Sequence, residues 1–256
     1  MPEFRRVSQE RYPRVKAVLV RVGVDQAYGA WNAPVNPETG AFVYVPIPDG
    51  PAKAYTPGNT RGFAEIDAPL ADFGVKNAVS GLQCPESLRQ RNMHLDPDFE
   101  NLTYGDNGKR RGSAIAKLTS DDLLVFYAGM RSITPPRKLQ YALIGLFVIQ
   151  GVVPAIEVPP ERRHENAHTR WTEISENDVV VRGKLGLSGR FNWSIRIGEW
   201  RDNAYRVCRD IEESWGGLTV KNGYIQRSVV PPTFIDAEKF YVWFRQQGIT
   251  LTPRNY

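Results

Sequence analysis

The part of the sequence with the most chemically active side chains runs from His94 to Asp106. It holds one histidine, three aspartates, one glutamate and one tyrosine within thirteen residues, with proline and glycine between them. Such a run has no regular amphipathic face, which disfavours a core role, and polar loops at the ends of strands often build sites. The alternative is a solvated loop whose Asp and Asn side chains form turns and helix caps.

Five titratable residues from separate stretches are candidates for catalysis: Asp25, His94, Asp96, Asp106 and His168. A carboxylate that orients a histidine makes a general acid or base that works near neutral pH. A second carboxylate could stabilise a positively charged sugar or act as nucleophile in glycosidic-bond cleavage. The same side chains could instead hold a divalent metal ion, but their spacing selects none, and no cofactor is predicted.

Other residues near these groups could bind a substrate. Aromatic rings can stack on a base, at about 1–3 kcal/mol per base, and arginines suit phosphate. Because the polar stretches all lie beside expected strands, we expect Asp25, His94–Asp98, Tyr104–Asp106 and Asn166–His168 to line one concave site. The candidate substrate-binding residues are Tyr28, Trp31, Asp98, Tyr104, Arg110, Tyr127, Arg131, Asn166 and Arg170.

The stretch from His164 to His168 matches H-E-x-x-H, a zinc-protease pattern with two histidines one helical turn apart. A zinc-binding helix of this kind needs an apolar face to bury, whereas residues 161–170 are almost wholly polar and follow two prolines. We therefore predict that the two histidines form no zinc-protease site. A metalloprotease stays a remote alternative.

The composition is that of an ordinary globular protein, with 41% hydrophobic and 24% charged residues in a 256-residue chain. The net charge of +5 and basic runs such as residues 109–111 make DNA or a nucleotide a plausible partner. The two cysteines, Cys84 and Cys208, are too few for a disulfide scaffold and indicate a reducing, cytoplasmic setting. The longest apolar run, 141–156, is too short and interrupted to span a bilayer, so no membrane partner is expected. The sequence does not indicate the oligomeric state.

Hydrophobic patterning predicts strands at 16–22, 41–48, 118–129, 141–153, 178–182 and 193–198, with a long surface excursion over 49–77. Helices are expected at 85–91, at 202–215 with Asp202 as N-cap, and at 236–247, where Phe240, Trp243 and Phe244 share one face. The expected fold is α+β, with a mostly antiparallel, barrel-like (PUA-like) sheet and two or three flanking helices. We expect one domain over residues 1–256, with a basic N-terminal segment (1–15) and a C-terminal helix (236–247).

Six motifs follow one another in a fixed order: Val18–Pro34, Tyr44–Asp49, His94–Asp98, Thr103–Asp106, Asp122–Ala128 and Asn166–Arg170. Together they resemble the third family of nucleotide-modification-associated domains, from about residue 16 to residue 197. One departure lies at the first turn, where family members have Lys/Arg-Gly-Phe-Asp-Ser-Ser and this chain has Arg21-Val-Gly-Val-Asp25-Gln-Ala. If those serines carry chemistry, this chain binds without turnover.

The resemblance implies a link to hypermodified nucleotides and DNA, without an established reaction. Residues 118–129 and 141–153 also look like the strands of PUA-like barrels, which hold a flipped or modified base in an aromatic pocket. The leading hypothesis is a nucleotide- or base-modifying enzyme, glycosidase-like or transferase-like, that uses His/Asp acid–base chemistry. The alternative is a non-catalytic reader of a modified base. A third hypothesis gives the motifs a loop-stabilising role only, with Asn166 and His168 satisfying buried backbone groups.

Overall fold

The structure is a computed structural model that describes residues 15–27, 31–50, 54–109, 111–226 and 230–256. Most of the basic N-terminal segment, together with Tyr28 and Arg110, lies outside the described residues. The described chain is α+β with mostly antiparallel strand pairing, which confirms that part of the expected fold class.

The strands are β1 (Ala17–Val22), β2 (Pro34–Val35), β3 (Ile47–Pro48), β4 (Met93–His94), β5 (Thr103–Asn107), β6 (Leu123–Ser132), β7 (Leu139–Pro154), β8 (Asp178–Gly183), β9 (Gly189–Arg196), β10 (Gly198–Arg201), β11 (Ala204–Val207) and β12 (Leu251–Thr252). The α-helices are α1 (Asp67–Lys76), α2 (Glu86–Arg89), α3 (Arg209–Ser214) and α4 (Ala237–Gln246). Short 3₁₀ helices connect them, including η5 (Pro160–Glu165) and η6 (Ala167–Thr169).

The main sheet is built on β6 and β7. β1 pairs with β6 in parallel, and the path continues antiparallel through β7 and β8 to β5. The 16-residue β7 pairs with β9 along its first half and with β8 along its second half. Among the described residues these pairings form an open path, so closure into a PUA-like barrel stays a prediction.

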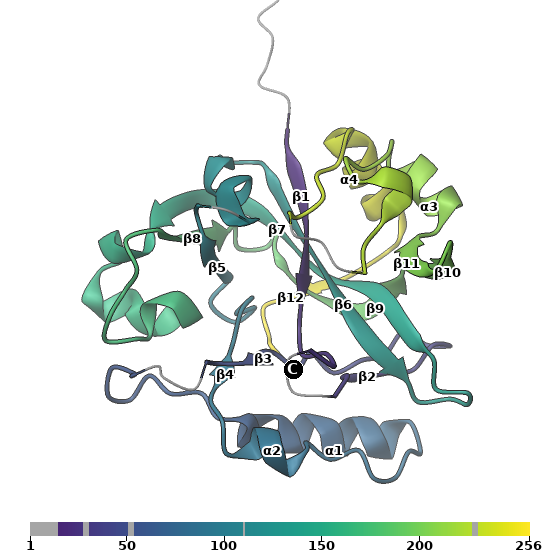
Figure 1. The fold of residues 1–256 in the computed structure, drawn as a ribbon, viewed down its shortest axis with the longest axis horizontal. Coiled ribbons are helices and arrows are strands. Elements are labelled where there is room, and N and C mark those ends of the chain that lie inside the picture. The colour runs from purple at the N-terminus through teal and green to yellow at the C-terminus, as the bar shows by residue number, and fades with distance from the viewer. Residues whose placement is uncertain (1–14, 28–30, 51–53, 110, 227–229) are drawn as a thin grey trace, which may run out of the picture.

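The central strands are apolar at nearly every position because both faces of the sheet are covered. On one face, Val20 and Phe126 join a core cluster that includes Phe73 of α1. On the other face, Leu19 belongs to a second cluster with Phe240 of α4. Figure 1 accordingly shows α1 and α2 on the opposite side of the molecule from α3 and α4. The sheet between them carries the loops that contain the polar motifs.

Most of the long elements lie where the sequence predicts them. β1, β7, β8 and α4 nearly match the expected ranges, and the side chain of Asp236 caps α4 by accepting a hydrogen bond from the backbone N of Lys239. The expected strand at 118–129 is displaced, because β6 begins at Leu123. The expected strand at 41–48 is wrong over most of its length. Only its last two residues form β3, while Phe42 makes an isolated bridge to Val35.

The helix expected at 202–215 is wrong over its first half. Asp202 and Asn203 adopt left-handed conformations, with φ of 51° and 58°, and join β10 to β11 as a two-residue hairpin turn. Such turns require positive φ at both central residues, which Asn and Asp tolerate better than most residues. The helix α3 therefore begins only at Arg209.

The surface excursion expected over 49–77 instead contains the helix α1. Its Pro69 lies in the first turn, where no intrahelical hydrogen bond from the backbone N is needed. Leu70 and Phe73 are buried against the sheet. None of the helices in the described part of the chain has the length and apolar character needed to span a bilayer.

Candidate active site

Two histidines from distant parts of the chain meet at one buried carboxylate. Nε2 of His94 lies 3.8 Å from Oδ2 of Asp96, and Nε2 of His168 lies 3.6 Å from the same oxygen. The two imidazole rings are 4.9 Å apart between centroids. We call His94, Asp96 and His168 the His–Asp–His cluster.

A separate aspartate orients each histidine from behind. Nδ1 of His94 lies 2.7 Å from Oδ1 of Asp49, and Nδ1 of His168 lies 2.6 Å from Oδ2 of Asp178. With both Nδ1 atoms occupied in this way, both Nε2 atoms are turned toward Asp96. The cluster therefore consists of two carboxylate–histidine pairs that converge on a third carboxylate.

Strand pairing positions the two outer aspartates, neither of which was predicted from the sequence as a site residue. β3 pairs with β4 so that Ile47 lies opposite His94, and Asp49, two residues further on, points to the same side and reaches His94. β5 pairs with β8 so that Asn107 lies opposite Asp178, and His168 reaches Asp178 from η6. The available signals were weak: Asp49 follows a Pro-Ile-Pro stop, and Asp178 opens a strand.

Hydrogen bonds from the backbone and from one amide side chain fix Asp96. The backbone N of Gly105 donates to both carboxylate oxygens, at 2.8 and 3.0 Å, and Nδ2 of Asn166 donates to Oδ1 at 3.3 Å. Oδ1 of Asn166 in turn accepts from the backbone N of His168. A Cβ at residue 105 would lie 2.4 Å from Cδ2 of His168, so only glycine fits between Asp96 and the imidazole.

Burial and the paired carboxylates shift the protonation of the cluster. Burial raises the pKa of Asp96 to about 8. Burial also lowers the pKa of His94, against the opposing hydrogen bond of Asp49. For His168, burial acts to lower the pKa, but the hydrogen bond of Asp178 and the charge of Asp96 outweigh it, and the pKa is raised. The two histidines therefore differ, with His168 the better proton acceptor.

Burial opposes ionisation of both outer aspartates as well, but their hydrogen bonds to histidine prevail and the pKa values of Asp49 and Asp178 are lowered.

Two aromatic residues contact the histidines and Asp49. The ring of Trp171 stacks on His94 at 5.7 Å and lies 5.4 Å from His168, and the hydroxyl of Tyr55 donates to Asp49.

The cluster forms part of the wall of a cavity of about 510 Å³, a size suited to a small-molecule ligand. All five candidate catalytic residues border this cavity: Asp25, His94, Asp96, Asp106 and His168. The structure thus places together stretches that are far apart in sequence. Their catalytic roles stay predictions.

Asp25 pairs with an arginine and not with a histidine of the His–Asp–His cluster. Its Oδ2 accepts from Nη2 of Arg21 at 2.5 Å, and its Oδ1 accepts from the backbone N of Ala27. The guanidinium carbon of Arg21 lies 5.2 Å from the ring centroid of Tyr141. Arg21, Asp25 and Tyr141 form a second polar part of the cavity wall.

The candidate aromatic residues differ in how far they reach the cavity. The hydroxyl of Tyr104 donates to Oδ2 of Asp106 at 3.1 Å, and both residues border the cavity. Tyr127 also borders it, but the residue is fully buried and its hydroxyl donates to the backbone O of Ile225. Its ring therefore belongs to the floor and offers no exposed face for stacking. Trp31 is not among the lining residues and packs against the core.

Of the other candidate binding residues, Arg131 is absent from the lining and donates to Oδ1 of Asn32, which does border the cavity. Asn166 acts through Asp96 and is likewise absent from the lining. Tyr28 and Arg110 lie outside the described residues.

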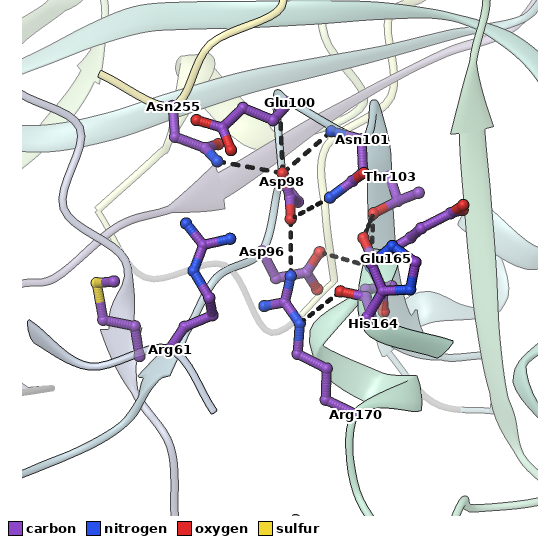
Figure 2. Close-up of polar contacts among 12 residues, drawn as sticks. Arg61, Asp96, Asp98, Glu100, Asn101, Thr103, His164, Glu165, Arg170 and Asn255 are labelled. Carbon is purple, nitrogen blue, oxygen red and sulfur yellow. Dashed lines mark hydrogen bonds and ion pairs between the residues drawn. The ribbon is translucent and has the colours of Figure 1, made fainter. Parts of the chain in front are cut away.

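Asp98 and Arg170 form a buried ion pair behind the cluster. Nη2 of Arg170 lies 2.8 Å from Oδ2 of Asp98, and Asn255, close to the C-terminal end, donates to Oδ1 of the same carboxylate at 3.1 Å. Figure 2 shows Asp98 enclosed by these partners and by Asn101. Neither Asp98 nor Arg170 borders the cavity, so the structure separates them from a substrate held there.

The H-E-x-x-H segment does not form a zinc-binding helix. η5 and η6 are separate 3₁₀ helices, and Asn166 between them is extended, with φ −142° and ψ 144°. His164 is exposed, and Glu165 pairs with Arg182 at 2.5 Å. The helical register that would set two histidines over one metal ion is therefore broken at Asn166.

A family model described as nucleotide modification associated domain 3 matches residues 16–208. The chain belongs to this family. The matched region contains the His–Asp–His cluster and both outer aspartates, whereas α4 and Asn255 lie beyond it. The comparison confirms the family that the sequence motifs resemble and gives the chain a role associated with nucleotide modification.

No curated protein matches the chain, and no solved structure matches it.

Proposed function

We propose that this member of the nucleotide modification associated domain 3 family is an enzyme that modifies or processes a base or nucleoside. The observation that carries the proposal is the pair of Asp-oriented histidines whose Nε2 atoms meet at Asp96 on the wall of a ligand-sized cavity. A carboxylate on Nδ1 fixes the orientation of an imidazole and leaves Nε2 to take or give a proton. Two such pairs facing one carboxylate are suited to acid–base chemistry, with glycosidase-like or transferase-like reactions as candidates.

The charges of the cavity favour the base or sugar part of a nucleotide as its occupant. Asp25, Asp96 and Asp106 border it, and the guanidinium of Arg21 is already paired with Asp25. Carboxylates accept hydrogen bonds from amino and hydroxyl groups but repel phosphate. We therefore place the phosphates of a nucleotide or of DNA outside the cavity, near the basic surface runs, and retain a cytoplasmic location as part of the proposal.

The test is mass spectrometry of nucleosides after incubation of the protein with modified and unmodified DNA and with free nucleotides. An enzyme releases a base or changes a nucleoside, and this change disappears in Asp96→Asn and in His168→Ala. His164→Ala is the matched control, because it removes an exposed imidazole from the same segment. Retention of a modified base with no chemical change would overturn the enzyme and favour the PUA-like reader. If the wild-type protein binds neither nucleotides nor nucleic acids at low salt, the assignment to nucleic acid fails.

A further inference from the structure

The His–Asp–His cluster has the donor set of a metal site. Three ligand atoms, one from each of His94, Asp96 and His168, all lie within 4.8 Å of one another. A divalent ion about 2.1 Å from each ligand needs ligand atoms between about 3.0 and 4.2 Å apart. The two distances to Oδ2 of Asp96, 3.6 and 3.8 Å, already fall in this interval. They are too long for hydrogen bonds, so a direct bond between imidazole and Asp96 does not account for the arrangement.

The second observation is the role of the two outer aspartates. Histidines that bind metals almost always pass their other ring N–H to a carboxylate, a backbone carbonyl or water, which fixes the ring and strengthens the ligand. Asp49 and Asp178 hold Nδ1 of His94 and His168 in this way. Both histidines carry the feature independently, because His94 lies on β4 and His168 lies on η6.

The charge of the carboxylates around the cluster also favours a bound cation. Three carboxylates, those of Asp49, Asp96 and Asp178, are each less than a tenth exposed and lie around two imidazoles. A buried negative charge is costly unless a cation compensates it. A dipositive ion between His94, Asp96 and His168 would allow all three carboxylates to be ionised together.

We propose that His94, Asp96 and His168 bind one divalent transition-metal ion, with Asp49 and Asp178 orienting the two histidines. Two imidazole nitrogens and one carboxylate suit Zn²⁺, Fe²⁺, Mn²⁺ or Co²⁺, whereas Mg²⁺ and Ca²⁺ prefer oxygen ligands alone. Three protein ligands leave a coordination position open, as in catalytic rather than structural sites. That position faces the cavity, because all three residues border it.

The role of this ion in catalysis rests on the proposed function. A bound ion lowers the pKa of a water molecule and can make it a nucleophile or base near neutral pH. His94 and His168 would then be ligands, and the proton-transferring group would be the bound water.

The experiment is calorimetric titration of untagged, EDTA-stripped protein with Zn²⁺ and Co²⁺, with Mg²⁺ for comparison. We expect one Zn²⁺ or Co²⁺ per chain, no comparable Mg²⁺ binding, and loss of the site in His168→Ala and in Asp96→Asn. His164→Ala should bind as the wild type does. Asp178→Asn should weaken binding by about 10–100-fold, because it removes only the orienting carboxylate. Thermal melts of each metal-free variant establish that it is folded.

A second measurement reports where the ion binds. Trp171 lies beside both imidazoles, so Co²⁺ in the cluster should quench part of the tryptophan fluorescence, and Trp171→Phe should remove that part while binding persists. No stoichiometric binding by the wild type, or equal binding by folded His168→Ala and Asp96→Asn variants, would overturn the proposal. Metal binding without any nucleoside change would leave the metal site standing and sink the proposed reaction. A nucleoside change by wild-type protein that binds no metal would overturn the metal site and leave the proposed reaction standing.

Discussion

Asp96 and Asp98 lie two residues apart on one loop and are both buried, but the protein treats their charges in opposite ways. Asp98 is fully buried and accepts hydrogen bonds from Arg170, Asn255 and Asn101. Asp96 is 7% exposed, borders the cavity, and faces two imidazoles at distances too long for hydrogen bonds.

This difference separates a structural carboxylate from a candidate functional one. The partners of Asp98 come from 72 and 157 residues away, so a single carboxylate ties the loop to η6 and to the C-terminal end. For Asp96, burial instead outweighs the compensating contacts and raises the pKa, which disfavours its charged form. Perturbed groups of this kind in a cavity are candidates for function, whereas fully paired groups stabilise the fold.

The largest effect should follow from breaking the structural pair. Arg170→Met leaves the Asp98 carboxylate buried without its cation, and we expect a loss of about 3–5 kcal/mol in the free energy of unfolding. The matched control is Lys184→Met, which breaks the exposed pair with Asp121 and should cost at most about 1 kcal/mol. Urea denaturation of both variants measures the difference. Equal losses would mean that Asp98 is not an anchor of the fold.

The second effect concerns pH and Asp96 in the metal-free protein. Its folded pKa, about 8, lies above the unfolded value, so between about pH 4 and pH 8 the folded state holds a proton that the unfolded state has lost. Its contribution to stability is therefore present at low pH and is lost as pH rises toward 8.

Asp96→Asn removes this loss. The variant should gain stability relative to wild type as pH rises from 5 to 8, by an amount on the order of a few kcal/mol. Thermal unfolding in EDTA across this pH range measures the gain. A constant difference between the two proteins would show that the pKa of Asp96 is not raised.

The sequence marked the three residues of the cluster as candidates together with Asp25 and Asp106, but it did not reveal the aspartates that orient the two histidines. His94, Asp96 and His168 stand out because imidazoles are rare in this chain, which has three, and because acids crowd around the first of them. Their orienting partners depend on which short strands pair. β3 and β4 have two residues each, and no propensity argument predicts such a pair.

The contrast between Asp96 and Asp98 could not be predicted from the sequence either. In Asp-Pro-Asp both acids have the same composition around them, and only the folded loop decides which one faces the cavity. The long strands were easier to predict, since continuous apolar runs indicate strands that are covered on both faces. The main error was the helix expected at 202–215. Asp202 can cap a helix or occupy a left-handed turn position, and the pairing of β10 with β11 selects the turn.

A smaller effect should follow from crowding the cluster. Gly105→Ala places a methyl group 2.4 Å from Cδ2 of His168, and we expect a loss of about 1–3 kcal/mol in unfolding free energy together with a displaced imidazole. Gly151→Ala is the control, because nothing lies within 4 Å of the added Cβ. With three histidines in the chain, imidazole NMR signals can report the displacement. An unchanged His168 signal in Gly105→Ala would show that the site tolerates the methyl group.

The smallest effect should be that of Asp96→Asn on general affinity for DNA. Phosphate contacts provide most of non-specific binding, and affinity then falls as salt rises. Asp96 lies in the cavity wall, so its replacement by Asn should leave this affinity nearly intact, or raise it slightly by removing a negative charge, while turnover or base preference is lost. Charge reversal at Arg110 and Arg111 should do the opposite, weakening the binding of all nucleic acids alike and flattening the salt dependence.

Fluorescence anisotropy with labelled DNA at several salt concentrations, run beside the nucleoside assay, distinguishes these outcomes. If Asp96→Asn loses DNA affinity in parallel with turnover, the carboxylate contributes to binding itself. The division between a reactive Asp96 and a phosphate-binding surface would then be wrong, and the cavity would have to admit the DNA backbone as well as the base.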